Sequence, residues 1–173
     1  MSPGPAGHWL RDGLNVSEDP DLETFIDGLG ALLDELQLPA LDLGASTVET
    51  SRSGVHVGLS HRHDGRTVDI AVVGEIVVSY GPEHEHFASD DADLGRVWPF
   101  EEDTHVAQAI SFIRYLLTGR IEVDVWRRPL ALKTRSYWIG EDGQRELFLR
   151  GGTIGPFFGW SRTPETHTFD FTV

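Results

Sequence analysis

The sequence predicts an α+β fold in which antiparallel sheet meanders follow two principal helices, so that a helix-then-strands unit occurs twice. Apolar residues recur at three- and four-residue steps in two stretches, one before residue 39 and one after residue 103. Each stretch is followed by segments of alternating apolar residues with turn sequences between them. Strands that occur in runs, and not singly between helices, are typical of antiparallel sheet.

The length of 173 residues suits one domain with its own core. The N-terminal stretch contains several Pro and Gly residues and shows no periodicity. We therefore expect residues 1–16 to be a flexible arm and residues 17–173 to be a single α+β domain.

The first helix is expected to begin after Ser17 or Asp19, either of which can cap it, and to end before Pro39. One side carries a continuous apolar stripe and the other side is acidic, as in a helix that covers a core. Gly28 and Gly30 each destabilise the helix by about 1 kcal/mol relative to Ala. Because glycine has no side chain, we expect a sheet to approach the helix closely at these positions.

Strands are predicted at 46–51 and 55–63, and an Asp-Gly turn leads to a returning segment at 66–80. Gly74 marks a bend or turn in that segment. Residues 81–102 hold most of the remaining acids of the front half and are predicted to be a loop.

The clearest pattern is a helix that runs directly into a strand between Asp103 and Trp126. Asp103 or Thr104 can cap the helix, and apolar residues line one face of it. Gly119 stands where a left-handed helix stop is expected, and the next residues alternate with the period of a half-buried strand.

The C-terminal part repeats the strand pattern. Strands are predicted at 131–139, 146–150 and 166–173, with a hairpin turn at 141–144 between the first two. The intervening stretch, 151–160, is rich in glycine and aromatic residues, but it lacks the motifs of a phosphate-binding loop.

The composition excludes several kinds of chemistry. Cysteine is absent, which excludes disulfides, thiolate metal sites and a cysteine nucleophile and fits a reducing compartment. There is neither a signal-peptide pattern nor an apolar run of the roughly 20 residues that cross a bilayer. We expect a cytoplasmic protein.

The charge is strongly acidic and unevenly distributed. The formal net charge is −14, and it divides into −16 for residues 1–103 and +2 for residues 104–173. Such a field disfavours nucleic acid and anionic lipid as partners and favours a basic protein partner. The alternative is that the acidity serves solubility only.

Five acids in the stretch before the predicted second helix are the candidate partner-binding residues: Asp90, Asp91, Asp93, Glu101 and Glu102. Three of them match a calcium-binding loop in spacing, but Arg96 stands at the position of its invariant glycine. We therefore interpret the set as a solvated acidic segment that contacts basic side chains of a protein.

The histidines suggest a second hypothesis. His61 with His63, and His84 with His86, are spaced so that both rings of a pair lie on one face of a strand, where a carboxylate can complete a metal site. The residues around both pairs lack the glycines and the downstream acid of a cupin-like motif. No metal, cofactor or catalytic residue is predicted, but an enzyme or ligand-binding domain that uses these histidines and nearby carboxylates is an alternative.

A third hypothesis is a small-molecule site lined by aromatic residues: Trp126, Trp138, Phe157 and Trp160. The cations interleaved with aromatic residues after residue 126 resemble an RNA-binding surface, but the overall charge opposes it and pairing with the acidic front half accounts for them. There is no nucleophile-elbow motif. The leading hypothesis is a non-enzymatic acidic protein-binding domain, such as an immunity or antitoxin-like inhibitor or a chaperone of a basic protein.

Overall fold

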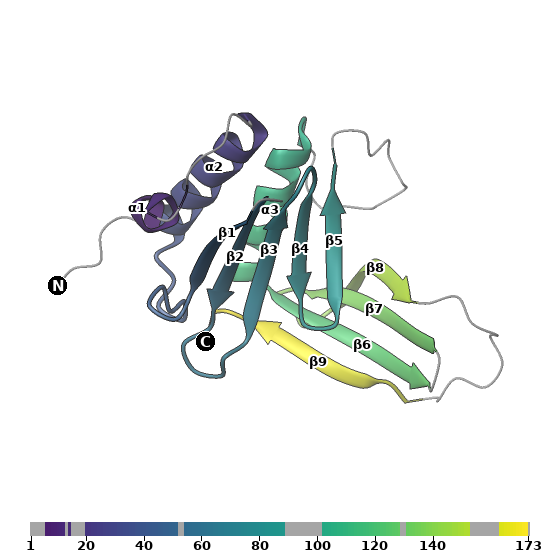
Figure 1. Cartoon of the computed structure of the whole chain (residues 1–173). Helices are drawn as coiled ribbons and strands as arrows, with labels where there is room; N and C mark the ends of the chain where they lie inside the picture. The colour runs from purple at the N-terminus through teal and green to yellow at the C-terminus, as the bar shows by residue number, and fades with distance from the viewer. Residues whose placement is uncertain are drawn as a thin grey trace.

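The computed structural model of the chain describes residues 6–12, 14, 20–51, 54–88, 102–128, 131–152 and 163–172. These residues contain three helices and nine strands in two antiparallel sheets, which confirms the predicted α+β fold class. The first sheet has the order β1-β2-β3-β4-β5, and the second has the order β8-β7-β6-β9 (Figure 1).

The first sheet is a meander, as predicted. Its strands are β1 (Thr47–Ser51), β2 (Gly54–Ser60), β3 (Thr67–Val72), β4 (Ile76–Tyr80) and β5 (Glu83–Phe87). Gly65 and Gly74 have φ angles of 66° and 73°, a left-handed conformation that favours glycine, in the two turns on either side of β3.

Strand β5 lies in the stretch predicted to be a loop, and this prediction is wrong for Glu83–Phe87. The inward positions of β5 are occupied by Glu83, Glu85 and Phe87. Because two of the three buried positions are carboxylates, the strand shows no apolar alternation that sequence reasoning would detect.

Helices α2 (Pro20–Leu36) and α3 (His105–Thr118) pack on one face of the first sheet (Figure 1). The alternating Val, Ile and Leu residues of β2, β3 and β4 point to this inner face and form one buried cluster with both helices. Each fully buried side chain of this size contributes about 1.5–3 kcal/mol of transfer free energy. The opposite face of the first sheet is covered by none of the three helices.

A third helix, α1 (Ala6–Arg11), lies within the stretch expected to be a flexible arm. Ala6 and Leu10 are buried against α2, so the structure differs from the expectation for these residues. A Cβ on Gly30 would lie 3.0 Å from the Cα of Gly7. Gly30 thus admits a second helix, and not a sheet, at close range.

The connection from α3 into the second sheet follows the sequence prediction in part. Thr104 caps α3, and its hydroxyl accepts a hydrogen bond from the Ala107 N–H at 3.1 Å. Gly119 has φ −107° and ψ 173°, which is extended and not left-handed. Glycine is needed there because a Cβ would lie 2.8 Å from the Tyr115 carbonyl oxygen.

The second sheet consists of β6 (Arg120–Arg128), β7 (Ala131–Ile139), β8 (Arg145–Gly152) and β9 (Glu165–Asp170). Strand β9 pairs with β6 and places Phe169 opposite Ile121. The sheet packs on α3 and on the β4–β5 end of the first sheet, where Trp138 stacks on Phe148 with ring centroids 3.7 Å apart.

Among the described residues, no helix has the length and apolar character needed to cross a membrane.

Candidate functional site

Four of the five acids predicted to bind a partner, Asp90, Asp91, Asp93 and Glu101, lie outside the described residues. The fifth, Glu102, lies three residues before the start of α3. Its carboxylate accepts a hydrogen bond from the Ser111 hydroxyl at 2.8 Å, and its carbonyl accepts one from the Gln108 side chain at 3.1 Å. Glu102 therefore holds the start of α3 while remaining exposed.

The acids on the solvent side of α2 hold neighbouring helices in place. Glu35 accepts two hydrogen bonds of 2.7 Å from the Arg114 guanidinium of α3, and Asp27 pairs with Arg11 of α1. The hydrogen bond from Arg114 lowers the pKa of Glu35. Exposed pairs of this kind contribute little stability individually, but they give these carboxylates a partner within the chain.

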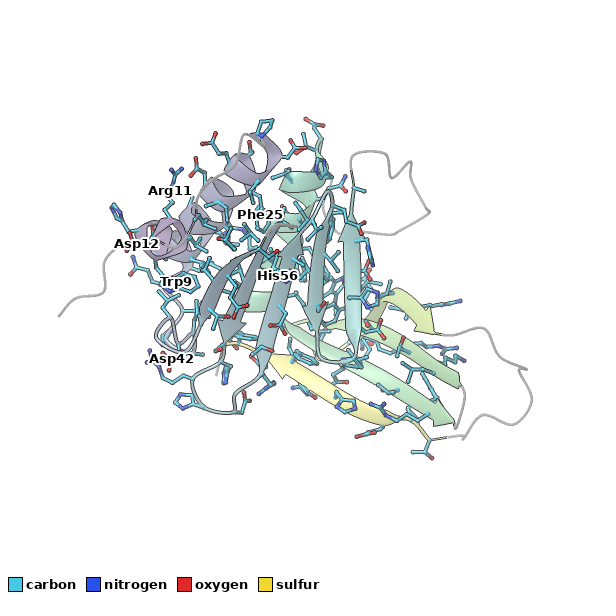
Figure 2. All side chains as sticks on the ribbon, viewed as in Figure 1. Trp9, Arg11, Asp12, Phe25, Asp42 and His56 are labelled. Carbon is cyan, nitrogen blue, oxygen red and sulfur yellow. The ribbon has the colours of Figure 1, made fainter. Side chains whose placement is uncertain are left out.

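A different set of polar residues lies on the uncovered face of the first sheet, which we call the outer face. Strand register aligns them in two rows, each of which crosses all five strands. One row is Glu49, His56, Ala71, Val77 and His86; the other is Thr47, Gly58, Asp69, Ser79 and His84. Figure 2 labels His56 on the first sheet, and in this view α3 lies behind the strands.

The outer face has small side chains in the centre and charged or imidazole groups around them. Gly58 has no side chain, and a Cβ there would lie 2.8 Å from the Thr47 hydroxyl and 3.4 Å from an Asp69 carboxylate oxygen. The Thr67 hydroxyl donates a hydrogen bond of 2.9 Å to the other Asp69 oxygen. Asp69 is therefore held in place on this face.

The charge on this face has one sign. The twenty-eight residues of β1–β5 include no Lys or Arg. Glu49 and Asp69 are exposed there, and Glu75 in the β3–β4 turn contacts His86, with its Oε1 3.1 Å from the imidazole Nδ1. The arrangement presents carboxylates and imidazoles to solvent and attracts a cationic surface.

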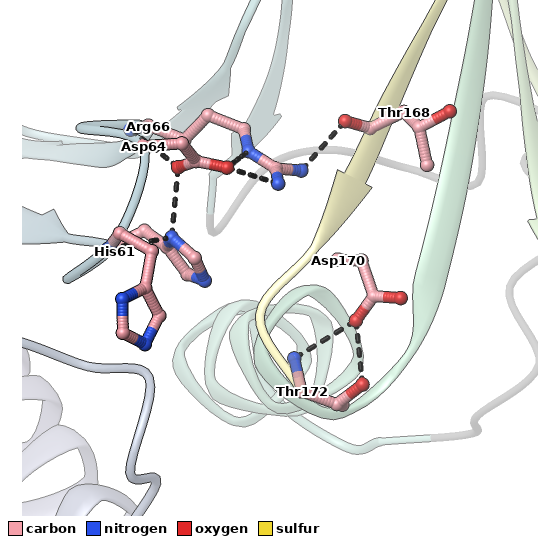
Figure 3. Close-up of polar contacts among 7 residues, drawn as sticks. His61, Asp64, Arg66, Thr168, Asp170 and Thr172 are labelled. Carbon is pink, nitrogen blue, oxygen red and sulfur yellow. Dashed lines mark hydrogen bonds and ion pairs between the residues drawn. The ribbon is translucent and has the colours of Figure 1, made fainter.

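The two histidine pairs do not share a face of the sheet. His84 and His86 lie on the outer face with ring centroids 5.1 Å apart. His61 is buried, its ring packs against Phe171 at 5.2 Å, and its Nδ1 lies 2.8 Å from an Asp64 oxygen (Figure 3). Within the part of the chain that the structure describes, no three His, Asp or Glu side chains converge as a metal site requires.

The predicted aromatic site is not assembled either. Trp138 is buried on the face of β7 that packs on α3, whereas Trp126 lies on the opposite face of the second sheet beside Lys133. Phe157 and Trp160 lie outside the described residues. The two tryptophans therefore cannot line one pocket.

A cavity of about 780 Å³ lies beyond the end of α2 and has several leucines in its lining. Its three charged side chains have partners within the chain: Asp34 accepts from the Ala6 N–H, Asp42 accepts from the Gly44 N–H, and Arg62 donates to the Leu41 carbonyl. A small-molecule site needs a few convergent polar groups for orientation. In this cavity the charged side chains are engaged by the chain itself, so we do not assign it as a ligand site.

Buried polar groups also occur where the two sheets meet. Glu83 and Tyr80 of the first sheet face Thr134 and Ser136 of the second, and the Tyr80 and Ser136 hydroxyls are 3.5 Å apart. Burial raises the pKa of Glu83, an effect that the Thr134 hydroxyl opposes, and burial raises the pKa of Tyr80 well above its ordinary value. This cluster joins the sheets and is enclosed by them.

Comparison with known proteins found no matching family model, no similar curated protein and no similar solved structure. The site must therefore be judged on its own geometry. Sequence reasoning missed the outer face because its residues come from five separate strands. One signal was present: residues 67–87 contain no Lys or Arg, although the neighbouring segments do.

Proposed function

We propose that this protein is a non-enzymatic binding protein for a basic protein partner, and that the partner docks on the outer face of the first sheet. The type of protein is that of an immunity or antitoxin-like inhibitor, or of a chaperone that acts in the cytoplasm. The observation that carries the proposal is a five-stranded face with exposed carboxylates and small central side chains, whose strands β1–β5 contain no Lys or Arg.

The size of the face supports a protein as the ligand. Five strands spaced by about 4.8 Å, each about five residues long, give a surface of roughly 19 by 17 Å. This matches the centre of a standard interface, which buries about 800 Å² per partner, so the partner also contacts the loops around the sheet. A small substrate needs a concave pocket, and none of the residues that line the cavity of about 780 Å³ belongs to β1–β5.

The charge supports a basic partner. Residues 1–103 carry a net charge of −16, while several acids of α2 are paired within the chain. Glu49 and Asp69 are the exposed strand carboxylates that point to the partner. Opposite potentials accelerate encounter and suppress incorrect partners, and both effects weaken as salt screens the charges.

The experiment is capture from a native lysate at low and moderate salt, followed by binding measurements on the captured protein. The test variant is E49K/D69K, and the control is E141K/E146K, which makes the same change in net charge at exposed positions in and after the β7–β8 turn. We expect the test variant to weaken binding at least about tenfold, mainly through a slower association rate, and the control to change it by less than about twofold.

Equal losses in the two variants would mean that only net charge matters and would contradict the assignment of the outer face. Failure to capture any basic protein that salt releases would contradict the proposed function itself.

A further inference from the structure

The second sheet also has a face turned away from α3, and its side chains differ from those of the first. Strand register places Lys133 beside Trp126 and Arg135 directly opposite Arg150. We call Lys133, Arg135 and Arg150 the basic patch.

Other cations of this sheet are neutralised by carboxylates of the same sheet. Arg145 lies 2.9 Å from Asp124 and 3.3 Å from Glu122, and Arg120 lies 2.8 Å from Glu122. The expectation that the basic residues after residue 126 pair with the acidic front half is therefore wrong for Arg145. Carboxylates of its own sheet are its partners.

The basic patch is left out of this pairing. Within the described residues, no ion pair joins Lys133, Arg135 or Arg150 to a carboxylate. Like charges directly opposite each other on adjacent strands are destabilising, yet Arg135 and Arg150 occupy such positions. On its other side Arg135 lies opposite Asp124 of β6, but that carboxylate is already bound by Arg145 at 2.9 Å and by the Thr166 hydroxyl at 2.7 Å. The two arginines are therefore a candidate site for an anion from outside the chain.

Trp126 holds two of the three cations in position. The Lys133 ammonium lies 5.1 Å and the Arg135 guanidinium carbon 5.6 Å from its ring centroid. Such cation–π contacts contribute about 0.5–1 kcal/mol each at exposed sites and reduce the freedom of long side chains. The cations are thus partly ordered before any ligand arrives.

We propose that the basic patch binds an acidic polypeptide segment of a protein partner, a second interaction separate from the one on the outer face. Guanidinium groups pair with carboxylates through two parallel hydrogen bonds, so Arg135 and Arg150 suit Asp or Glu side chains. A nucleic acid fits less well, because bases need a free aromatic ring for stacking and Trp126 is already engaged by two cations.

The test uses the full chain and a labelled oligo-glutamate peptide of roughly eight residues, long enough when extended to cross a four-stranded sheet. The patch variants are R135Q and R150Q. The control is R127Q, which removes one charge from the same sheet at an arginine that is 61% exposed and lies 3.6 Å from Glu165. We expect each patch variant to weaken binding about tenfold and R127Q to weaken it by less than about twofold.

Thermal melting supplies a second readout. R150Q removes one of two like charges, so its Tm should equal or exceed that of the wild type while its affinity falls. A fall in Tm that parallels the loss of binding would overturn the proposal, because the arginine would then be structural. Equal losses in R127Q and the patch variants would also overturn it, as would tighter binding of an oligothymidylate of the same length. Self-association of the chain that is lost in R135Q would assign the patch to a second copy and overturn the peptide assignment.

Discussion

The two sheets are similar in construction but opposite in the charges they carry. The strands of the first contain four acids and no cation, whereas those of the second contain five acids and seven cations. The first sheet has an outer face of small and acidic side chains, and the second pairs most of its acids with arginines while leaving three cations together.

This difference shows that net charge alone does not locate a binding surface. Asp27 and Glu35 of α2 are exposed, as Glu49 and Asp69 of the first sheet are, but Arg11 engages Asp27 and Arg114 engages Glu35. Glu49 and Asp69 differ because no cation reaches them from the strands around them. What distinguishes a candidate surface is therefore the local balance of charge and not the total.

The two sheets pack against each other, and Gly81 of the first sheet's β4–β5 turn lies directly against Phe169 of the second. Its φ is 59°, and a Cβ would lie 2.2 Å from the Phe169 ring of β9. G81A should therefore lower the free energy of unfolding by about 3 kcal/mol or more, through backbone strain and a forced shift of Phe169. Chemical denaturation of G81A and of the wild type measures this change in the free energy of unfolding.

Gly143 provides the matched control. Its φ is 77°, but nothing lies within 4 Å of the position of a Cβ. G143A should therefore cost only about 1 kcal/mol, the strain of the left-handed conformation. If the two substitutions cost the same, the contact between the β4–β5 turn and β9 is not needed for stability.

The ion pairs between arginines and carboxylates of the second sheet can be tested at Arg145. Asp124 is 5% exposed and accepts hydrogen bonds from Arg145 at 2.9 Å and from the Thr166 hydroxyl at 2.7 Å. R145M leaves this carboxylate without its cation and should cost about 2 kcal/mol. The double variant R145M/D124N should recover most of the loss, because the buried charge is then also removed; a double variant no more stable than R145M would contradict this account.

Much of this architecture could be predicted from the sequence. The periodicity of α2, the cap at Thr104 and the β2–β3 turn are local signals, and all three are present in the structure. Strand β5 and helix α1 were missed because one has buried carboxylates and the other is only six residues long. The outer face was missed because it depends on register between five strands. Local patterns do not encode which distant residues become neighbours.

The buried carboxylate Glu83 gives a smaller, pH-dependent effect. Burial raises the pKa of Glu83 in the folded state, so the folded protein holds this proton more tightly than the unfolded chain. Stability from this group is present below the ordinary pKa of about 4.5 and is lost as the pH rises through the folded-state value.

E83Q should therefore stabilise the protein at pH 7 by on the order of 1 kcal/mol and remove this part of the pH dependence. Denaturation of both proteins between pH 4 and pH 8, as rough limits, measures the difference. Destabilisation by E83Q at pH 7 would show that the charged form has a partner that compensates for its burial.

The smallest effect is expected at the polar link between the sheets shown in Figure 3. Asp64 pairs with Arg66, and Arg66 donates a hydrogen bond of 2.8 Å to the Thr168 carbonyl of β9. The hydrogen bond from Arg66 lowers the pKa of Asp64 from 3.8 to about 2. Because the folded-state pKa is depressed, this stability is present above pH 3.8 and is lost as the pH falls through about 2.

D64N keeps a side-chain oxygen for the Arg66 N–H but removes the charge. Since the Asp64 side chain is 36% exposed, solvent screening reduces the expected loss to about 0.5–1 kcal/mol at pH 7. The difference between D64N and the wild type should disappear near pH 2, where the wild-type carboxylate is also becoming neutral. A difference that persists unchanged at that pH would mean that Asp64 acts through the shape of the turn, and the link between the sheets would then rest on Phe169 and Gly81 and not on charge.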